Sequence, residues 1–217
     1  MGETDKAKAF FDQFAEVFDT LYEGKRSCWM QLLDRKFRSD IYIRFKRTFE
    51  TLGDLEGRTV LDIGCGSGVY VIESLRRGAK HVVALDVAPA MLRLVRSRLQ
   101  DSGMEDRCEL VLGAFPDVSL QPADCVIVMG VMDYVKNAEE FLCRLRPLVR
   151  ESAALSFPSR HWLRTPLRKF RYTLRNCPVY FYDVQAIKSL AQHAGFNTSD
   201  VCKIPGAGMD FHVTLQP

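Results

Sequence analysis

The sequence has few of the features that would assign it to a membrane, a metal site or an oxidising compartment. None of its apolar runs approaches the length of a membrane span, and residues 1–6 carry no apolar signal core. Its seven cysteines have no paired spacing and no C-x-x-C occurs, which excludes a zinc ribbon and a dithiol redox motif. No His, Asp or Glu grouping has metal-ligand spacing. We therefore expect a cytoplasmic protein that works without a metal.

Charge and composition exclude further classes. The net charge is only +3, which by itself indicates no nucleic-acid partner. Hydrophobic residues make up 47% of the chain, enough for a sizeable core, so extensive disorder is excluded. With 217 residues, no internal repeat and no low-complexity segment, the chain fits one α/β domain with a modest addition. The oligomeric state is left open.

The most informative stretch is an apolar strand pattern that turns through glycines into a helical pattern. The strand is expected at residues 59–63, and the glycines that follow can take positive φ and approach a ligand closely. Asp62 lies beside this turn, where a carboxylate would repel a pyrophosphate and attract a cationic ligand. The dinucleotide fingerprint G-x-G-x-x-G would need a glycine where Val69 stands. The stretch reads Leu61-Asp62-Ile63-Gly64-Cys65-Gly66-Ser67-Gly68.

This stretch resembles the first motif of the class I S-adenosylmethionine-dependent methyltransferases. The resemblance covers about residues 59–196. It implies a Rossmann-like, doubly wound α/β fold: a mostly parallel seven-stranded sheet with N-terminal helices and a helical insertion after strand five. It also implies S-adenosylmethionine as the cofactor and methyl transfer as the activity. The cofactor-binding residues that it implies are Asp62, Gly64, Cys65, Gly66, Gly68, Asp86, Val87, Met91, Ala114, Phe115 and Met129.

A second motif lies about twenty residues beyond the glycine turn, where an apolar run over residues 81–86 ends in Asp86. A carboxylate there can accept hydrogen bonds from a ribose diol, or it could cap the next helix. Met91 could touch the adenine or only pack in the core. After strand three the family has an acid where this chain has Ala114. We expect backbone groups of Ala114 and stacking by Phe115 to replace that contact.

In this family the end of strand four, expected over residues 123–129, faces the transferred methyl group. Methyltransferases acting on amino groups of nucleic-acid bases carry an Asn/Asp-Pro-Pro-aromatic tetrad there, which this chain lacks. Asp133 and Tyr134 are therefore catalytic candidates on the substrate side. Alternatively, Asp133 caps the next helix and Tyr134 packs.

A basic, aromatic segment follows strand five. Residues 160–175 combine arginines, a lysine and a histidine with aromatic residues, and they contain no acid. It could bind an anionic small molecule, an anionic membrane surface or RNA phosphates, or form a solvated cover. We expect a substrate cover over about residues 158–182. His161 is the first candidate for a base or acceptor-orienting group, an ordinary surface histidine being the alternative. The expected substrate contacts here are Arg160, Arg164, Arg168, Tyr180 and Tyr182.

Residues 1–53 are expected to form a helical lid before a methyltransferase domain at 54–217. Residues 6–22 and 27–52 have helical apolar spacing, which suits either a lid over the ligand or a helix packed on the core. Tyr22 is the lid residue expected to meet substrate. Most basic residues within 27–52 are interpreted as a solvated face.

The Arg-rich segment and residues 130–134 look similar to a bacterial group of small-molecule methyltransferases, some named after magnesium-protoporphyrin carboxyl methylation. This similarity favours transfer to oxygen on a small acceptor, which could be anionic. The missing tetrad and the modest net charge disfavour a nucleic-acid partner. Two alternatives stay open. One is an RNA methyltransferase that uses the Arg-rich segment, and the other is a methyltransferase-fold protein that binds cofactor without turnover.

Overall fold

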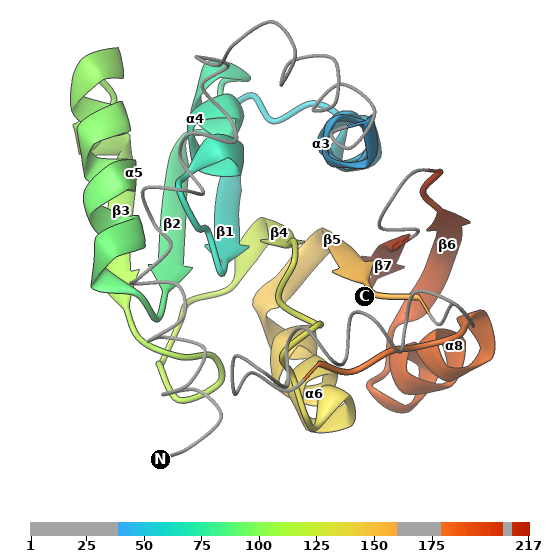
Figure 1. The fold of residues 1–217 in the computed structure, drawn as a ribbon. Helices are drawn as coiled ribbons and strands as arrows, with labels where there is room; N and C mark the ends of the chain where they lie inside the picture. Colours follow the sequence, from blue (N-terminus) through green and yellow to red (C-terminus); the bar gives the residue numbers. More distant parts are fainter. Residues whose placement is uncertain (1–38, 160–178, 206–209) are drawn as a thin grey trace, which may run out of the picture.

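One seven-stranded sheet organises the chain. The structure is a computed structural model that describes residues 39–159, 179–205 and 210–217. The strand order is β3-β2-β1-β4-β5-β7-β6, with helices on both faces of the sheet (Figure 1). Neighbouring strands from β3 to β5 are parallel, whereas β7 runs antiparallel to both β5 and β6. The strands are β1 (Thr59–Ile63), β2 (His81–Asp86), β3 (Cys108–Leu112), β4 (Ala123–Val128), β5 (Val149–Phe157), β6 (Asn197–Lys203) and β7 (Phe211–Gln216). The predicted Rossmann-like, mostly parallel seven-stranded fold is confirmed.

The helices form two layers, because alternate residues of each central strand face opposite sides of the sheet. In β1, Val60 packs with residues of α3 (Ser39–Leu52), α4 (Val69–Arg76) and α5 (Pro89–Ser102). Leu61 packs instead with residues of α6 (Ala138–Leu145) and α8 (Val184–His193). The two short 3-10 helices are η1 (Glu105–Arg107) and η2 (Arg146–Leu148). Both faces of the parallel strands are thus covered, which accounts for their continuous apolar runs.

Local sequence explains where the helices begin. Gly68 precedes α4 in the left-handed conformation, with φ 83°, and a proline occupies the first turn of α5. The Asn137 side chain caps α6 by accepting from the Glu140 N–H and donating to the Glu140 carboxylate, while Asp183 caps α8. The alternative in which Asp133 caps the helix after strand four is therefore excluded.

Helix α3 is part of the same core as the sheet. Phe49 and Leu52 are buried in a cluster with strand residues, and Phe49 stacks near Tyr70 of α4, with ring centroids 6.0 Å apart. The helix predicted within residues 27–52 is observed from residue 39 onward. Of the residues predicted for the lid and the cover, Tyr22, Arg160, His161, Arg164 and Arg168 lie outside the described residues. The division into 1–53 and 54–217 stays a prediction.

The described helices are all too short or too polar to cross a lipid bilayer.

Candidate active site

A cavity of about 610 Å³ opens at the carboxyl ends of the parallel strands. It extends from the turn after β3, at Phe115 and Asp117, to Asp210 just before β7. Its centre is the point between β1 and β4 where the strand order reverses direction. Open α/β sheets bind ligands at this point, because the loops leaving the two strands diverge there.

The glycine turn after β1 is fastened to the neighbouring strand β2. The Gly64 and Cys65 N–H groups both donate to the Leu85 carbonyl, at 2.8 and 3.0 Å. The Gly66 N–H donates to Asp86 Oδ2 at 2.9 Å. The loop is thus fastened to the same strand that carries the second sequence motif, and all five of these residues line the cavity.

Asp86 organises the turn and faces the cavity at once. Its other oxygen, Oδ1, accepts from the Ala88 N–H at 2.9 Å, and the residue is 7% exposed. The cap position of α5 is Ala88, without a side-chain cap, so Asp86 supports the turn before the helix rather than capping it directly. A carboxylate has about four acceptor positions, so one that faces a cavity can accept hydrogen bonds from ligand hydroxyl groups as well as from backbone N–H groups. Its assignment to a ribose stays a prediction.

The three glycines of the motif differ in what surrounds them. A Cβ at Gly64 would lie 2.3 Å from Val131 Cγ2, and one at Gly68 would lie 2.9 Å from Val95 Cγ2. At Gly66 a Cβ would meet no protein atom within 4 Å, although Gly66 lines the cavity. The lack of a side chain at Gly64 and Gly68 therefore allows Val131 and Val95 to pack against the turn, whereas the lack of one at Gly66 leaves room in the cavity. Gly68, predicted to bind cofactor, lies outside the cavity wall.

Asp62 is placed differently from the sequence argument. It is 1% exposed, lies within β1 and is not part of the cavity wall, so it sits behind the glycine turn rather than at its mouth. Its Oδ2 has no hydrogen-bond partner among the residues that the structure describes. Burial, and then the nearby Asp86 charge, raise the pKa of Asp62 to about 8. At neutral pH its carboxyl is therefore mostly protonated in the unliganded protein, and its predicted attraction for a cation requires deprotonation on binding.

The turn after β3 provides the wall expected to face an adenine. Ala114 and Phe115 line the cavity, and the Phe115 ring packs edge-on against Phe141, with centroids 4.8 Å apart. An acid is present nearby after all, because Asp117 also lines the cavity and its N–H donates to the Ala114 carbonyl. The sequence reasoning missed Asp117 because it compared only the position of Ala114. Val87 and Met91 line the cavity as well.

The end of β4 supplies the opposite wall, where Met129, Asp133 and Tyr134 all face the cavity. Asp133 is 5% exposed, and its carbonyl accepts from the Tyr180 N–H at 2.9 Å. The Tyr182 hydroxyl donates to the Val135 carbonyl at 3.3 Å. Burial, then the Asp133 charge, raise the pKa of Tyr182 to about 12. The segment after strand five thus packs against the end of β4, but neither Tyr180 nor Tyr182 lines the cavity.

The sequence reasoning also missed a charged pair on the wall. Arg44 of α3 and Asp210 both line the cavity, and Arg44 Nη1 lies 3.9 Å from Asp210 Oδ2. Most basic residues within 27–52 were interpreted as a solvated face, but the Arg44 side chain is only 17% exposed. The interpretation fails here because α3 packs over β5 and β7, which residue spacing alone does not reveal. Its helical position beside Phe45 and Thr48 could have indicated an inward orientation.

Acids outnumber cations on this wall. Among the described residues that line the cavity, the cations are Arg44 and Lys136, and the acids are Asp86, Asp117, Asp133, Glu140 and Asp210. Such a wall favours a positively charged ligand. In the described part of the chain, no cluster of three or more His, Cys, Asp or Glu side chains is arranged to hold a metal ion.

This fold and this site define a class of protein. A family model described as a methyltransferase domain matches residues 60–152. The chain therefore carries a methyltransferase domain, and its fold is that of the class I S-adenosylmethionine-dependent methyltransferases.

Particular relatives can be named beside it. The chain is 29% identical to a tRNA U34 carboxymethyltransferase of Shewanella halifaxensis over 70% of this chain and 46% of the relative. It is 33% identical to the protein of that name from Idiomarina loihiensis, over 71% of this chain and 50% of the relative. The chain thus spans about half the length of the curated relatives it matches.

Among solved structures, the magnesium protoporphyrin IX methyltransferase of Synechocystis with bound S-adenosylhomocysteine matches 99% of both chains. Its TM-score is 0.83 at 17% sequence identity, which establishes a shared fold. The predicted likeness to that group is confirmed at the level of the fold.

One expectation needs correction. The balanced net charge and the missing tetrad were taken to disfavour a nucleic-acid partner. Relatives that match about 70% of this chain are named for tRNA, which contradicts that expectation. The tetrad is typical of methyltransferases that act on amino groups of bases, so its absence says nothing about other RNA methyltransferases. Net charge is an average over surfaces of opposite sign. Neither observation therefore excludes an RNA substrate.

Proposed function

We propose that this chain transfers a methyl group from S-adenosylmethionine to an oxygen of a small acceptor. The observation that carries the proposal is the acid-walled cavity at the strand reversal, with the glycine turn hydrogen-bonded to Asp86. The cavity volume of about 610 Å³ lies within the range of small-molecule sites, roughly 300–1,000 Å³. When bound, the cofactor would supply a methyl group attached to a positively charged sulfur. Once the methyl group is transferred, the sulfur remains in the cofactor product as a neutral thioether.

The residues fit this cofactor in three respects. Asp86 offers carboxylate lone pairs at the end of β2 for a ribose diol, and Gly66 leaves room where a side chain would intrude. Phe115 and Met91 offer apolar surface for an adenine. Asp62 is a buried acid behind the glycine turn, with an oxygen that has no partner among the described residues, and an ammonium group from the amino-acid end of the cofactor would satisfy it if that group reached past the turn.

The acceptor would lie toward the end of β4. Asp133 and Tyr134 would orient it there, and Asp133 could accept a proton from a hydroxyl acceptor, whereas a carboxylate acceptor needs no base at neutral pH. The chain's main contribution would be alignment of the acceptor and exclusion of water from the cavity. His161 and the Arg-rich segment keep their predicted roles as proposals.

The first test is cofactor binding. Calorimetry with S-adenosylhomocysteine should give a clear affinity for the wild type, reduced about 10–100-fold in Asp86→Asn, because the ligand's buried hydroxyls lose a charged acceptor. Asp101→Asn, at an exposed position on α5, is the matched control and should bind like the wild type. No measurable binding by the folded wild type would sink the proposal.

The second test is turnover with methyl-labelled S-adenosylmethionine. One arm offers small carboxylic acids and phenols, and the other offers tRNA, the acceptor named for the curated relatives. Label in the first arm supports the proposal, and label only in tRNA replaces it with RNA methylation. Binding without label in either arm would favour the protein without turnover.

A further inference from the structure

Arg44 is unusual among the residues on the cavity wall. It is a mostly buried guanidinium in a wall where acids predominate. Its ion pair with Asp210, at 3.9 Å, is longer than the roughly 2.7–2.9 Å of a direct charge-assisted hydrogen bond. Asp210 is thus an acid beside Arg44 that is not in direct hydrogen-bond contact across this pair of atoms, and both residues belong to the cavity lining.

The strand order shows which end of the cavity this pair occupies. Asp210 directly precedes β7, whose first residue, Phe211, pairs with Phe157 at the carboxyl end of β5. Asp86 lies at the end of β2, on the other side of β1 and β4. The charged pair thus lies at the opposite end of the cavity from the proposed ribose site.

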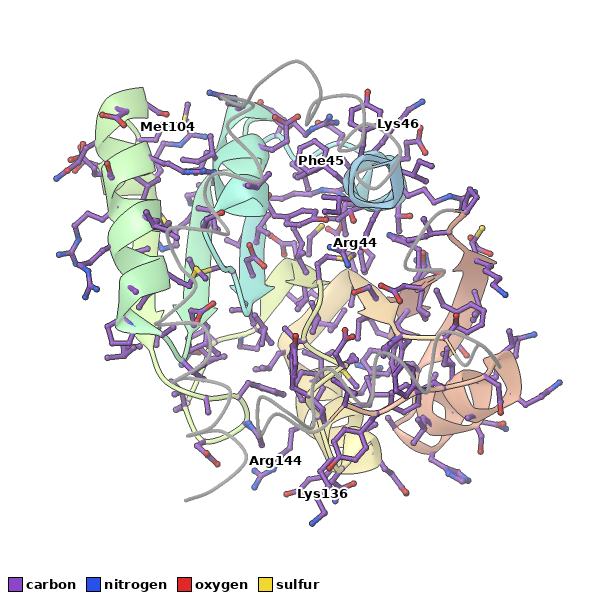
Figure 2. All side chains as sticks on the ribbon, viewed as in Figure 1. Arg44, Phe45, Lys46, Met104, Lys136 and Arg144 are labelled. Carbon is purple, nitrogen blue, oxygen red and sulfur yellow. The ribbon has the colours of Figure 1, made fainter. Side chains whose placement is uncertain are left out.

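Arg44 is held there by the packing of its helix. Phe45 lies against Phe49 and Tyr70, with ring centroids 5.1 and 5.4 Å away, and Tyr70 itself lines the cavity. Figure 2 labels Arg44 on the side of α3 that faces the sheet, above β5. One turn along the same helix, Arg47 pairs with Asp200 at 3.6 Å, away from the cavity.

We propose that Arg44 binds a carboxylate group of a ligand in this cavity, with Asp210 as the internal counter-ion that holds the guanidinium before the ligand arrives. A guanidinium presents a planar fork of donors that matches a carboxylate. This inference rests on the proposed function. The carboxylate can come from the amino-acid end of the cofactor or from an acceptor, and the experiment separates these sources.

The first arm measures nucleoside binding by calorimetry. S-Adenosylhomocysteine carries the carboxylate, and 5′-methylthioadenosine is the same nucleoside without the amino-acid end. If the cofactor supplies the carboxylate, Arg44→Gln should weaken S-adenosylhomocysteine at least tenfold and 5′-methylthioadenosine less than twofold. Arg47→Gln, from the same helix, is the matched control and should change neither.

The second arm measures the acceptor end, with and without S-adenosylhomocysteine. Benzoate and its uncharged analogue benzamide are titrated by NMR. If an acceptor supplies the carboxylate, the wild type should prefer benzoate, and Arg44→Gln should lose that preference. A folded Arg44→Gln protein that matches the wild type in both arms overturns the inference. Failure of the wild type to bind either nucleoside instead refutes the proposed function, while the benzoate arm without nucleoside still decides the role of Arg44.

A purely structural ion pair predicts a different outcome for Asp210. If Asp210 competes with a ligand carboxylate, Asp210→Asn should raise the affinity of the carboxylate-bearing probe several-fold. If the pair only fastens α3, the same variant lowers the unfolding temperature and leaves or weakens affinity, which counts against the inference.

Discussion

At the scale of single residues, the glycines of the turn after β1 divide by function. Gly64 and Gly68 accommodate the side chains of Val131 and Val95, whereas Gly66 faces open space in the cavity. All three have positive φ, which is the shared backbone requirement for glycine. The steric requirement differs, because a side chain would clash with the protein at Gly64 and Gly68 and would enter the cavity at Gly66. The sequence pattern alone does not distinguish them.

Gly66→Ala tests this division. The positive φ of Gly66 should make alanine cost about 1–2 kcal/mol of folding stability. S-Adenosylhomocysteine affinity should fall more than tenfold, because the new methyl group occupies ligand space. Gly53→Ala is the matched control, since Gly53 also has positive φ and no atom within 4 Å of a built Cβ. Equal affinity losses in both variants, measured by calorimetry, would mean that strain rather than space is responsible.

Asp62 should make the unliganded protein lose stability as pH rises. Its folded pKa is about 8 against an ordinary value of 3.8, so between those values the folded state binds more protons than the unfolded state. The free energy of unfolding should therefore fall with pH across that window, by up to about 1.4 kcal/mol per pH unit. Asp62→Asn, which mimics the protonated acid, should flatten this dependence in urea titrations at pH 5 to 8. An unchanged slope would contradict the assigned pKa.

The same group predicts a proton released on cofactor binding. If an ammonium group reaches Asp62, the carboxyl should ionise, because a neighbouring cation lowers its pKa. Calorimetry of S-adenosylhomocysteine at pH 7 in phosphate and in Tris should then show a buffer-dependent enthalpy, absent in Asp62→Asn. Identical enthalpies in both buffers for the wild type would remove Asp62 from the amino-acid end of the site.

At the scale of elements, α3 connects the cavity to the far strands of the sheet. Beneath it lies His212 of β7, which is fully buried, and in the described part of the chain neither of its ring nitrogens has a hydrogen-bond partner. The Thr214 hydroxyl, two residues on, donates to the Thr51 hydroxyl of α3 at 3.5 Å. Burial, then Arg47, lower the pKa of His212 to about 4, with Asp200 opposing and Arg44 reinforcing that shift. The packing of α3 on β7 therefore favours the neutral form of His212.

His212 should couple α3 docking to acid pH. Its ordinary pKa is 6.5, so between 6.5 and about 4 the unfolded state binds more protons than the folded state. Stability should be unaffected by this group above 6.5 and should fall as pH drops toward 4, by up to about 1.4 kcal/mol per pH unit. His212→Leu should remove that part of the acid sensitivity in thermal unfolding at pH 4 to 7. His193→Leu, at an exposed position in α8, is the control and should keep it.

At the scale of the whole molecule, the site is a property of strand order. Residues from the turn after β3 to the start of β7 are brought to one edge because β1 and β4 are neighbours although two strands separate them in the chain. The cavity wall is therefore built from both halves of the sheet. The curated relatives share about half their length with this chain, so their acceptor is a hypothesis for it and not a property of it.

Local patterns predicted much of the fold. The apolar runs at residues 59–63 and 81–86 are strands with those bounds, because burial on both faces requires uninterrupted apolar residues. Glycine spacing and an acid at a strand end predicted the turn and Asp86 beside it, since both signals act over a few residues. Asp133 and Tyr134 were likewise found on the cavity wall where the end of strand four indicated.

Only the tertiary structure decided which charges face the cavity. Asp62 is buried behind the turn rather than at its mouth, Asp117 lines the cavity near Ala114, and Arg44 lies on the cavity wall although most basic residues of its stretch were expected to face solvent. The physical reason is that secondary structure follows from spacing along the chain, whereas exposure and pKa depend on which distant elements pack against a residue. The strands and the turn follow from neighbouring residues, and the charge of the site follows from the placement of α3 and β7 beside them.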